Sequence, residues 1–201
     1  MFRRRLSLKT VPEKAEEVIS MAETNRDAYT STAKTLHWLI LALLIVQFIL
    51  AWTMPDIRRD TPVTTLIGFH FSFGVLILFV AVVRLAWRLT HGEPEPEDRI
   101  PPWQAASARV VHWLLYLLLF VLPVLGWINA CWRGMPVSFF GVFEMPRIVA
   151  TRAPGWAWTG DIHGLLANYA LLALVGLHVA AALYHFFVRG DRVLQRMLPR
   201  T

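Results

Sequence analysis

Four long stretches of this chain contain no Asp, Glu, Lys or Arg, and they limit its fold more than any other feature. They cover residues 35–55, 61–83, 110–132 and 162–188, with lengths of 21, 23, 23 and 27 residues. A helix needs about 17–25 mainly apolar residues to cross the hydrocarbon core of a bilayer. The composition agrees, because 56% of the 201 residues are hydrophobic and the mean hydropathy is +0.46. Intrinsic disorder is excluded and an ordinary soluble enzyme is disfavoured. We therefore expect an all-α fold, an integral membrane four-helix bundle.

The basic residues between these stretches are unevenly distributed, and this predicts the orientation. The segments on the N-terminal side of the bilayer carry 15 Lys and Arg residues, whereas the opposite segments carry 5. By the positive-inside rule, both termini are expected to be cytoplasmic. The net charge of +6 lies in these segments without an aromatic-interleaved patch, so we expect contact with membrane lipid and no nucleic acid. Four tryptophans near the far ends are placed as an interfacial aromatic belt, namely Trp52, Trp132, Trp156 and Trp158.

The polar segments divide the chain into three parts. Residues 1–35 are expected to form a polar cytoplasmic extension without an assignable site, 36–190 the transmembrane bundle and 191–201 a basic cytoplasmic tail. The one sizeable far-side loop covers 133–161. The basic start is followed by no apolar run, so we expect no cleavable secretory signal. The single cysteine, Cys131, excludes an internal disulfide framework and a Cys-rich metal site.

Six of the seven histidines lie within the apolar segments, which favours a cofactor site. Each could simply hydrogen-bond a neighbouring helix or reach the interface, but ionisable residues inside a membrane are more often functional. No carboxylate lies beside them, which disfavours a hard-ion site, and zinc would require three or four ligands at one depth. Pairs of histidines at two depths suit two bis-histidine haems in a helix bundle. The six are His37, His70, His112, His163, His178 and His185.

The depth of each histidine predicts how they pair. His70 and His163 lie near the far face, while His178 lies about 22 Å deeper along the same helix as His163. His37, at the start of the first helix, lies near the cytoplasmic face. His70 is therefore expected to pair with His163 and His37 with His178. A regular helix would leave His163 and His178 roughly 60° apart, on one broad face.

Two other histidines compete for the inner position. His112 begins the third helix at nearly the depth of His37, and could be a ligand or could hydrogen-bond a haem propionate or a quinol. His185 points in an acceptable direction but lies about 33 Å from His163, at the level of the headgroups. Arg84, Arg88 and Arg109 lie at the same side and could pair with propionates, or could be ordinary positive-inside anchors.

An ordered set of motifs resembles the bacterial cytochrome b561 family of four-helix di-haem membrane cytochromes. The resemblance runs from about residue 30 to the C-terminus. It rests on LHWL in the first helix, on FHFSFG and VVRLAWRL in the second, and on VHWLLYLLLFVLPVLGW in the third. The far-side loop contributes RGMPVSFFGVFEMP, and the last helix and tail contribute HGLLAN, GLHVAAALYH and RMLPR. The family's axial ligands fall on His37, His70, His163 and His178. One departure is the 15-residue spacing in the last helix, since the family spacing is 14.

The resemblance implies a multi-pass protein of the bacterial inner membrane that binds two haem b groups. Such a protein would transfer electrons between the quinone pool and another redox partner, and ubiquinone is the expected substrate. Some members resemble superoxide oxidases, which pass electrons from superoxide to ubiquinone. An alternative is a haem b subunit docked to a partner dehydrogenase or a c-type cytochrome, and a periplasmic donor or acceptor is compatible with either. An alternative of another class is a histidine-lined membrane transport or interaction protein without haem, which the lack of charged residues in the spans disfavours. Arg133, Arg147 and Arg152 of the far-side loop could attract an anion such as superoxide, or could make ordinary headgroup contacts.

Overall fold

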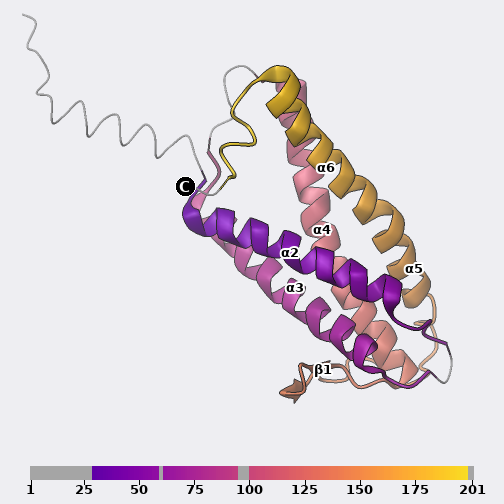
Figure 1. Cartoon of the computed structure of the whole chain (residues 1–201). Coiled ribbons are helices and arrows are strands. Elements are labelled where there is room, and N and C mark those ends of the chain that lie inside the picture. Colours follow the sequence, from indigo (N-terminus) through magenta and orange to yellow (C-terminus); the bar gives the residue numbers. More distant parts are fainter. Residues whose placement is uncertain (1–28, 59–60, 95–99, 199–201) are drawn as a thin grey trace, which may run out of the picture.

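Four helices long and apolar enough to cross a membrane form the described part of the chain (Figure 1). The computed structural model describes residues 29–58, 61–94 and 100–198. The first three spans are α2 (Ser31–Thr53), α3 (Thr65–His91) and α4 (Pro102–Arg133). The fourth, Thr159–Arg189, consists of α5 (Thr159–Leu165), η1 (Leu166–Leu171), α6 (Leu172–Tyr184) and η2 (His185–Arg189). The predicted all-α membrane bundle is therefore confirmed.

The helix ends differ from the bounds of the charge-free stretches because local capping sets them. The hydroxyls of Thr30 and Thr64 accept hydrogen bonds from the first turns of α2 and α3. α4 starts with Pro102, whose missing N–H and fixed φ suit the first turn, and it ends at Gly134 in the left-handed conformation (φ 81°). α2 begins at Ser31, within the segment 1–35 that was expected to be a polar extension. Residues 1–28 of that segment lie outside the described residues.

The bundle is a chain of neighbouring helices with two distinct ends. α2 packs on α3, α3 on α4, and α4 on α5, η1 and α6 of the fourth span. Side chains of α2, α4 and the fourth span meet midway in a cluster that includes Leu44, Leu118, Leu122 and Leu171. We call the end at which α2 and α4 begin the tail end, since Trp38 Nε1 donates to the Met197 carbonyl there (2.9 Å). The opposite end is the hairpin end, where β1 lies in Figure 1.

The fourth span is not a regular α-helix. Two π-helical segments interrupt it, η1 between His163 and His178 and η2 directly after Tyr184. A π-turn takes up one residue more than an α-turn. The 15 residues from His163 to His178 therefore turn the chain as about 14 α-helical residues would, which leaves the two side chains about 40° apart rather than the expected 60°.

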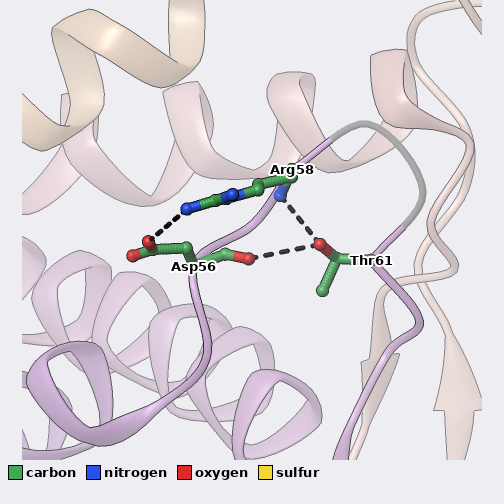
Figure 2. Close-up of polar contacts among 3 residues, drawn as sticks. All are labelled: Asp56, Arg58 and Thr61. Carbon is green, nitrogen blue, oxygen red and sulfur yellow. Dashed lines mark hydrogen bonds and ion pairs between the residues drawn. The ribbon is translucent and has the colours of Figure 1, made fainter.

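The hairpin end is closed by two ordered connections. The 133–161 loop contains a short antiparallel pair, β1 (Ser138–Phe139) and β2 (Phe143–Glu144), and the buried Ser72 hydroxyl of α3 donates to the Ser138 carbonyl (2.9 Å). In the α2–α3 connection, the Thr61 hydroxyl accepts from Arg58 N (2.8 Å), and an exposed Arg58–Asp56 ion pair (3.5 Å) lies beside it (Figure 2). The strands are too short to change the fold class.

The outward faces of the spans are suited to lipid. Large apolar side chains are exposed along every span, as expected where hydrocarbon is the surrounding medium. Trp52 and Trp158, at the hairpin end, are 62% and 50% exposed, and such exposure is compatible with an interfacial position. Other exposed apolar side chains include Ile45, Ile49, Phe79, Leu117 and Leu177.

Candidate functional site

The structure brings the imidazole rings of His70 and His163 next to each other near the hairpin end. Their ring centroids are 6.2 Å apart with an interplanar angle of 79°. His163 Nδ1 donates to the backbone carbonyl of Leu122 in α4 at 2.9 Å. This hydrogen bond fixes the ring and leaves Nε2 with the lone pair, which is the usual arrangement behind a metal-binding imidazole.

A cavity of about 390 Å³ surrounds this first pair. It extends among α2, α3, α4 and the fourth span, and its lining includes the two rings together with Gly74, Gly126 and Gly164. A side chain at Gly164 would meet no atom within 4 Å, whereas a Cβ at Gly126 would lie 3.2 Å from His163 Cε1. Gly126 therefore makes room for the imidazole, while the open space beside Gly164 suits a flat macrocycle.

Three histidines, rather than two, converge toward the tail end. The ring centroid of His178 lies 6.0 Å from that of His37 and 5.3 Å from that of His112. The predicted His37–His178 pair is thus adjacent, and so is the competing His112. Among residues 29–58, 61–94 and 100–198, no cluster of three or more His, Cys, Asp or Glu side chains is placed to hold a bare metal ion.

Both predicted pairs have the spacing of bis-histidine ligation. Two imidazole nitrogens on opposite sides of one metal ion, each about 2 Å from it, lie about 4 Å apart. Each ring centroid lies about 1 Å behind its nitrogen, so the centroids would be about 6 Å apart. The separations of 6.2 and 6.0 Å agree with this value. The donor set and the cavity therefore fit haem.

His185 lies apart from both pairs and has a partner of its own. Its Nδ1 donates to Oδ2 of Asp191 (2.5 Å), a buried carboxylate that also accepts from Val193 N (3.3 Å). The π-turn of η2 and the following Gly190, in the left-handed conformation, bring Asp191 back against the helix end. The structure thus gives His185 a local hydrogen-bond partner at the end of the span.

The arginines of α3 face the tail end. Arg84 donates from Nε to the Tyr116 hydroxyl (3.1 Å) and from Nη1 to the Ala33 carbonyl (3.1 Å). Arg88 is ion-paired with Glu93 and lies over the rings of Trp113 and Tyr116. Arg109 is exposed, so it fits an interfacial anchor.

A second cavity of about 290 Å³ adjoins Arg84 and Arg88. Burial, followed by the negative charge of Glu93, raises the pKa of the Tyr29 hydroxyl above its ordinary value, so this group is a neutral hydrogen-bond donor at neutral pH. The lining includes Tyr29, Thr30, Arg84, Trp87, Arg88, His91 and Tyr116.

Sequence reasoning missed Gln47. This side chain of α2 lines the first cavity, and its Nε2 donates to the backbone carbonyl of His70 at 3.1 Å. The available signal was its position as a single amide in a long apolar run, because polar residues inside a membrane span usually have a specific partner.

Comparison with known proteins identifies the family to which the chain belongs. The family model of prokaryotic cytochrome b561 matches residues 28–200. Cytochrome b561 homolog 2 of Escherichia coli (strain K12) is 30% identical over 183 residues, covering 90% of this chain and 97% of its own length. Probable superoxide oxidase CybB of Yersinia pestis is 32% identical over 168 residues, covering 82% and 92%. Cytochrome b562 of Cereibacter sphaeroides is 30% identical over 184 residues, covering 87% and 98%. The chain therefore belongs to the prokaryotic cytochrome b561 family and is a multi-pass b-type cytochrome of the bacterial inner membrane that transfers electrons.

Proposed function

We propose that the chain binds two haem b groups, one between His70 and His163 and one between His37 and His178. The observation that carries this proposal is the presence of two adjacent imidazole pairs at two levels of one bundle. The ring centroids are 6.2 Å apart in one pair and 6.0 Å apart in the other. His112 is the competing inner ligand. Its centroid distance of 5.3 Å from His178 is shorter than two imidazoles on one iron require, which favours His37.

Haem b supplies one-electron chemistry when bound. The chain holds it through the four imidazoles, keeps water away with the apolar side chains of the spans, and fixes the His163 ring through Leu122. Arg84 and Arg88 carry positive charge at the tail end, where a haem propionate or a quinone oxygen could accept from a guanidinium. His112 lies close enough to His178 to take part there.

We propose ubiquinone as the partner in electron exchange, with both termini cytoplasmic. The excess of basic residues at the tail end supports this orientation. The second cavity, with Tyr29, Arg84 and Tyr116 in its wall, supports a polar ligand near the inner histidines. Replacing Arg84 or Arg88 with Gln should then slow reduction of the haem by ubiquinol without changing haem content.

A superoxide:ubiquinone oxidoreductase activity is the second candidate, supported by the similarity to probable superoxide oxidase CybB and by three arginines at the hairpin end. The Arg133 guanidinium donates to Asn129 Oδ1 (2.8 Å), and Arg147 donates to the Thr151 hydroxyl (3.1 Å). Arg152 lies over the Trp132 ring, 4.7 Å from its centroid. Such a cluster could steer a small anion from the far side. If replacing all three with Gln leaves the rate and its dependence on ionic strength unchanged, this candidate is wrong.

The deciding experiment is a reduced-minus-oxidised visible spectrum of the purified protein, with haem measured per chain. Two b-type haems per chain would support the proposal. One haem would mean that one pairing is wrong, with the inner pair examined first. A colourless protein, after expression with sufficient haem, would overturn the proposal.

A further inference from the structure

Residues 138–143 of the 133–161 loop form an apolar hairpin, built from β1, a turn and the start of β2. We propose that this apolar hairpin is a membrane anchor, which places its aromatic and aliphatic side chains in the lipid leaflet at the hairpin end. Its partner is a lipid surface, at the boundary between headgroups and acyl chains. The inference does not depend on the haem ligands.

The apolar hairpin exposes several large hydrophobic side chains. Val142 is 77% exposed, Phe143 is 51% exposed and Phe140 is 41% exposed. Residues 134–143 contain no Asp, Glu, Lys or Arg that could solvate this group. Contiguous exposed apolar side chains of this kind mark a contact with a membrane or with another protein.

The turn of the apolar hairpin has an unusual residue at its centre. Val142 N donates to the Phe139 carbonyl at 2.9 Å, and the central residues Phe140 and Gly141 have φ values of 47° and 75°. A hairpin turn with two positive φ angles usually takes Asn, Asp or Gly first, because a bulky side chain is strained there. A phenylalanine in this position indicates that its ring has a role beyond the turn.

The apolar hairpin lies against the side of α3 rather than beyond its end. Ser72 Oγ accepts from Phe140 N at 3.0 Å, and the Phe140 ring centroid lies 5.3 Å from that of Phe73. Phe73 is about 12 Å along α3 from its first residue. The 27 residues of α3 span about 40 Å, so a centred helix extends about 5 Å beyond each side of a hydrocarbon core of about 30 Å. The contact with Phe73 is therefore at a depth within the leaflet.

This side of α3 faces away from His70 and toward lipid. Ser72 follows His70 by two residues and so lies about 160° from it around the helix. Phe79 lies seven residues after Ser72, on the same side, and is 64% exposed. Nearer the hairpin end, the 42% exposed Phe69 contacts Phe140, with ring centroids 6.5 Å apart. Figure 1 shows β1 at the edge of the bundle beside this end of α3. The exposed side chains of the apolar hairpin thus continue the lipid-facing surface of the span, which favours lipid over a water-soluble protein partner.

The backbone of the apolar hairpin also suits contact with lipid. Backbone N–H and C=O groups near hydrocarbon need partners within the protein. The Ser138 carbonyl accepts from the Ser72 hydroxyl (2.9 Å), and Met145 N, just after the hairpin, donates to the Val137 carbonyl (2.8 Å). Val137 is buried and lines the first cavity directly before β1. Anchoring the apolar hairpin therefore fixes one wall of that cavity relative to the leaflet.

The test attaches a nitroxide spin label to Val142→Cys in the full-length protein, reconstituted into vesicles of phosphatidylethanolamine and phosphatidylglycerol. Electron paramagnetic resonance then measures collisions of the label with O₂, which concentrates in hydrocarbon, and with a water-soluble nickel chelate. We expect collisions with O₂ to exceed those with the chelate. Phe143→Cys repeats the measurement at a second exposed position. Cys131 is 2% exposed, so wild-type protein treated with the label gives the background.

Two further positions are the controls. Phe79→Cys, on the lipid-facing side of α3, should favour O₂. Asp56→Cys, in the α2–α3 connection, should favour the nickel chelate, because the Asp56 side chain is 85% exposed and charged.

Labels at 142 and 143 that favour the nickel chelate, as at Asp56→Cys, would overturn the inference, because the apolar hairpin would then lie in water. Labels shielded from both reagents would also overturn it, since a second copy of the chain or another protein would then cover the hairpin. Ser72→Ala should increase the mobility of the label at position 142, because it removes the hydroxyl that binds the hairpin backbone. Unchanged mobility would contradict the proposed attachment to α3.

Discussion

Nδ1 of His163 lies 2.9 Å from the backbone carbonyl of Leu122 and donates to it, which ties the fourth span to α4 at the level of the first cavity. Gly126 lies one turn beyond Leu122 on the same face of α4. The imidazole therefore lies against backbone where most residues would present a side chain.

Gly126→Ala should displace the His163 ring. The added methyl would lie 3.2 Å from Cε1 and 3.3 Å from Nδ1 of the imidazole, which requires the ring to move by a few tenths of an ångström. We expect a loss of stability of about 1–3 kcal/mol, as for overpacking of a core, with a shifted spectrum for one haem. Thermal unfolding and a low-temperature reduced spectrum would measure both effects. Gly164→Ala is the control, because an added methyl there meets no atom within 4 Å. The two variants are compared without haem, and equal loss of stability in both would contradict this explanation.

The η1 segment should tolerate a deletion but not an insertion. Deleting Tyr169, which is 71% exposed, would let η1 become α-helical while His163 and His178 keep their directions. Inserting one alanine after Tyr169 would rotate His178 by about 100° relative to His163, unless the bulge widened. Haem per chain should therefore stay at the wild-type value in the deletion variant and fall in the insertion variant. The opposite order would show that η1 does not set the register.

The sequence predicted most of this arrangement because the bilayer imposes simple rules. Four charge-free stretches required four spans, and a rise of 1.5 Å per residue placed each histidine at a depth. The adjacency of His70 with His163 and of His37 with His178 follows from these depths.

Other features depend on contacts between helices, which a linear pattern does not record. The π-turn in η1 has no signal in residue type, although the 15-residue spacing, one longer than the family spacing, agrees with its extra residue. The π-turn changes the angle between His163 and His178. The contact of Gln47 with His70 depends on the rotation of α2 against α3. Depth alone also could not separate His37 from His112, because both lie near His178.

Single alanine variants should separate the two inner candidates. If His37 is the ligand, His37→Ala should remove one haem per chain, whereas His112→Ala should keep both haems and change their potential or their reaction with quinol. The measurement is haem per chain, with the reduced spectrum recorded for each variant. Loss of one haem in His112→Ala with two retained in His37→Ala would reverse the assignment.

Asp191→Ala should destabilise the tail end of the fourth span. The carboxylate is buried and accepts from His185 Nδ1 at 2.5 Å and from Val193 N at 3.3 Å, so its removal leaves two donors unpaired. We expect the free energy of unfolding to fall by about 1–3 kcal/mol, measured by circular dichroism in detergent. Asp191→Asn should lose less, because the amide oxygen can still accept one of these hydrogen bonds. Asp56→Ala is the control, because both side chains of the Asp56–Arg58 ion pair are exposed and exposed ion pairs contribute little to stability. Equal stability of Asp191→Ala and the wild-type protein would show that the His185–Asp191 contact does not hold this end of the helix.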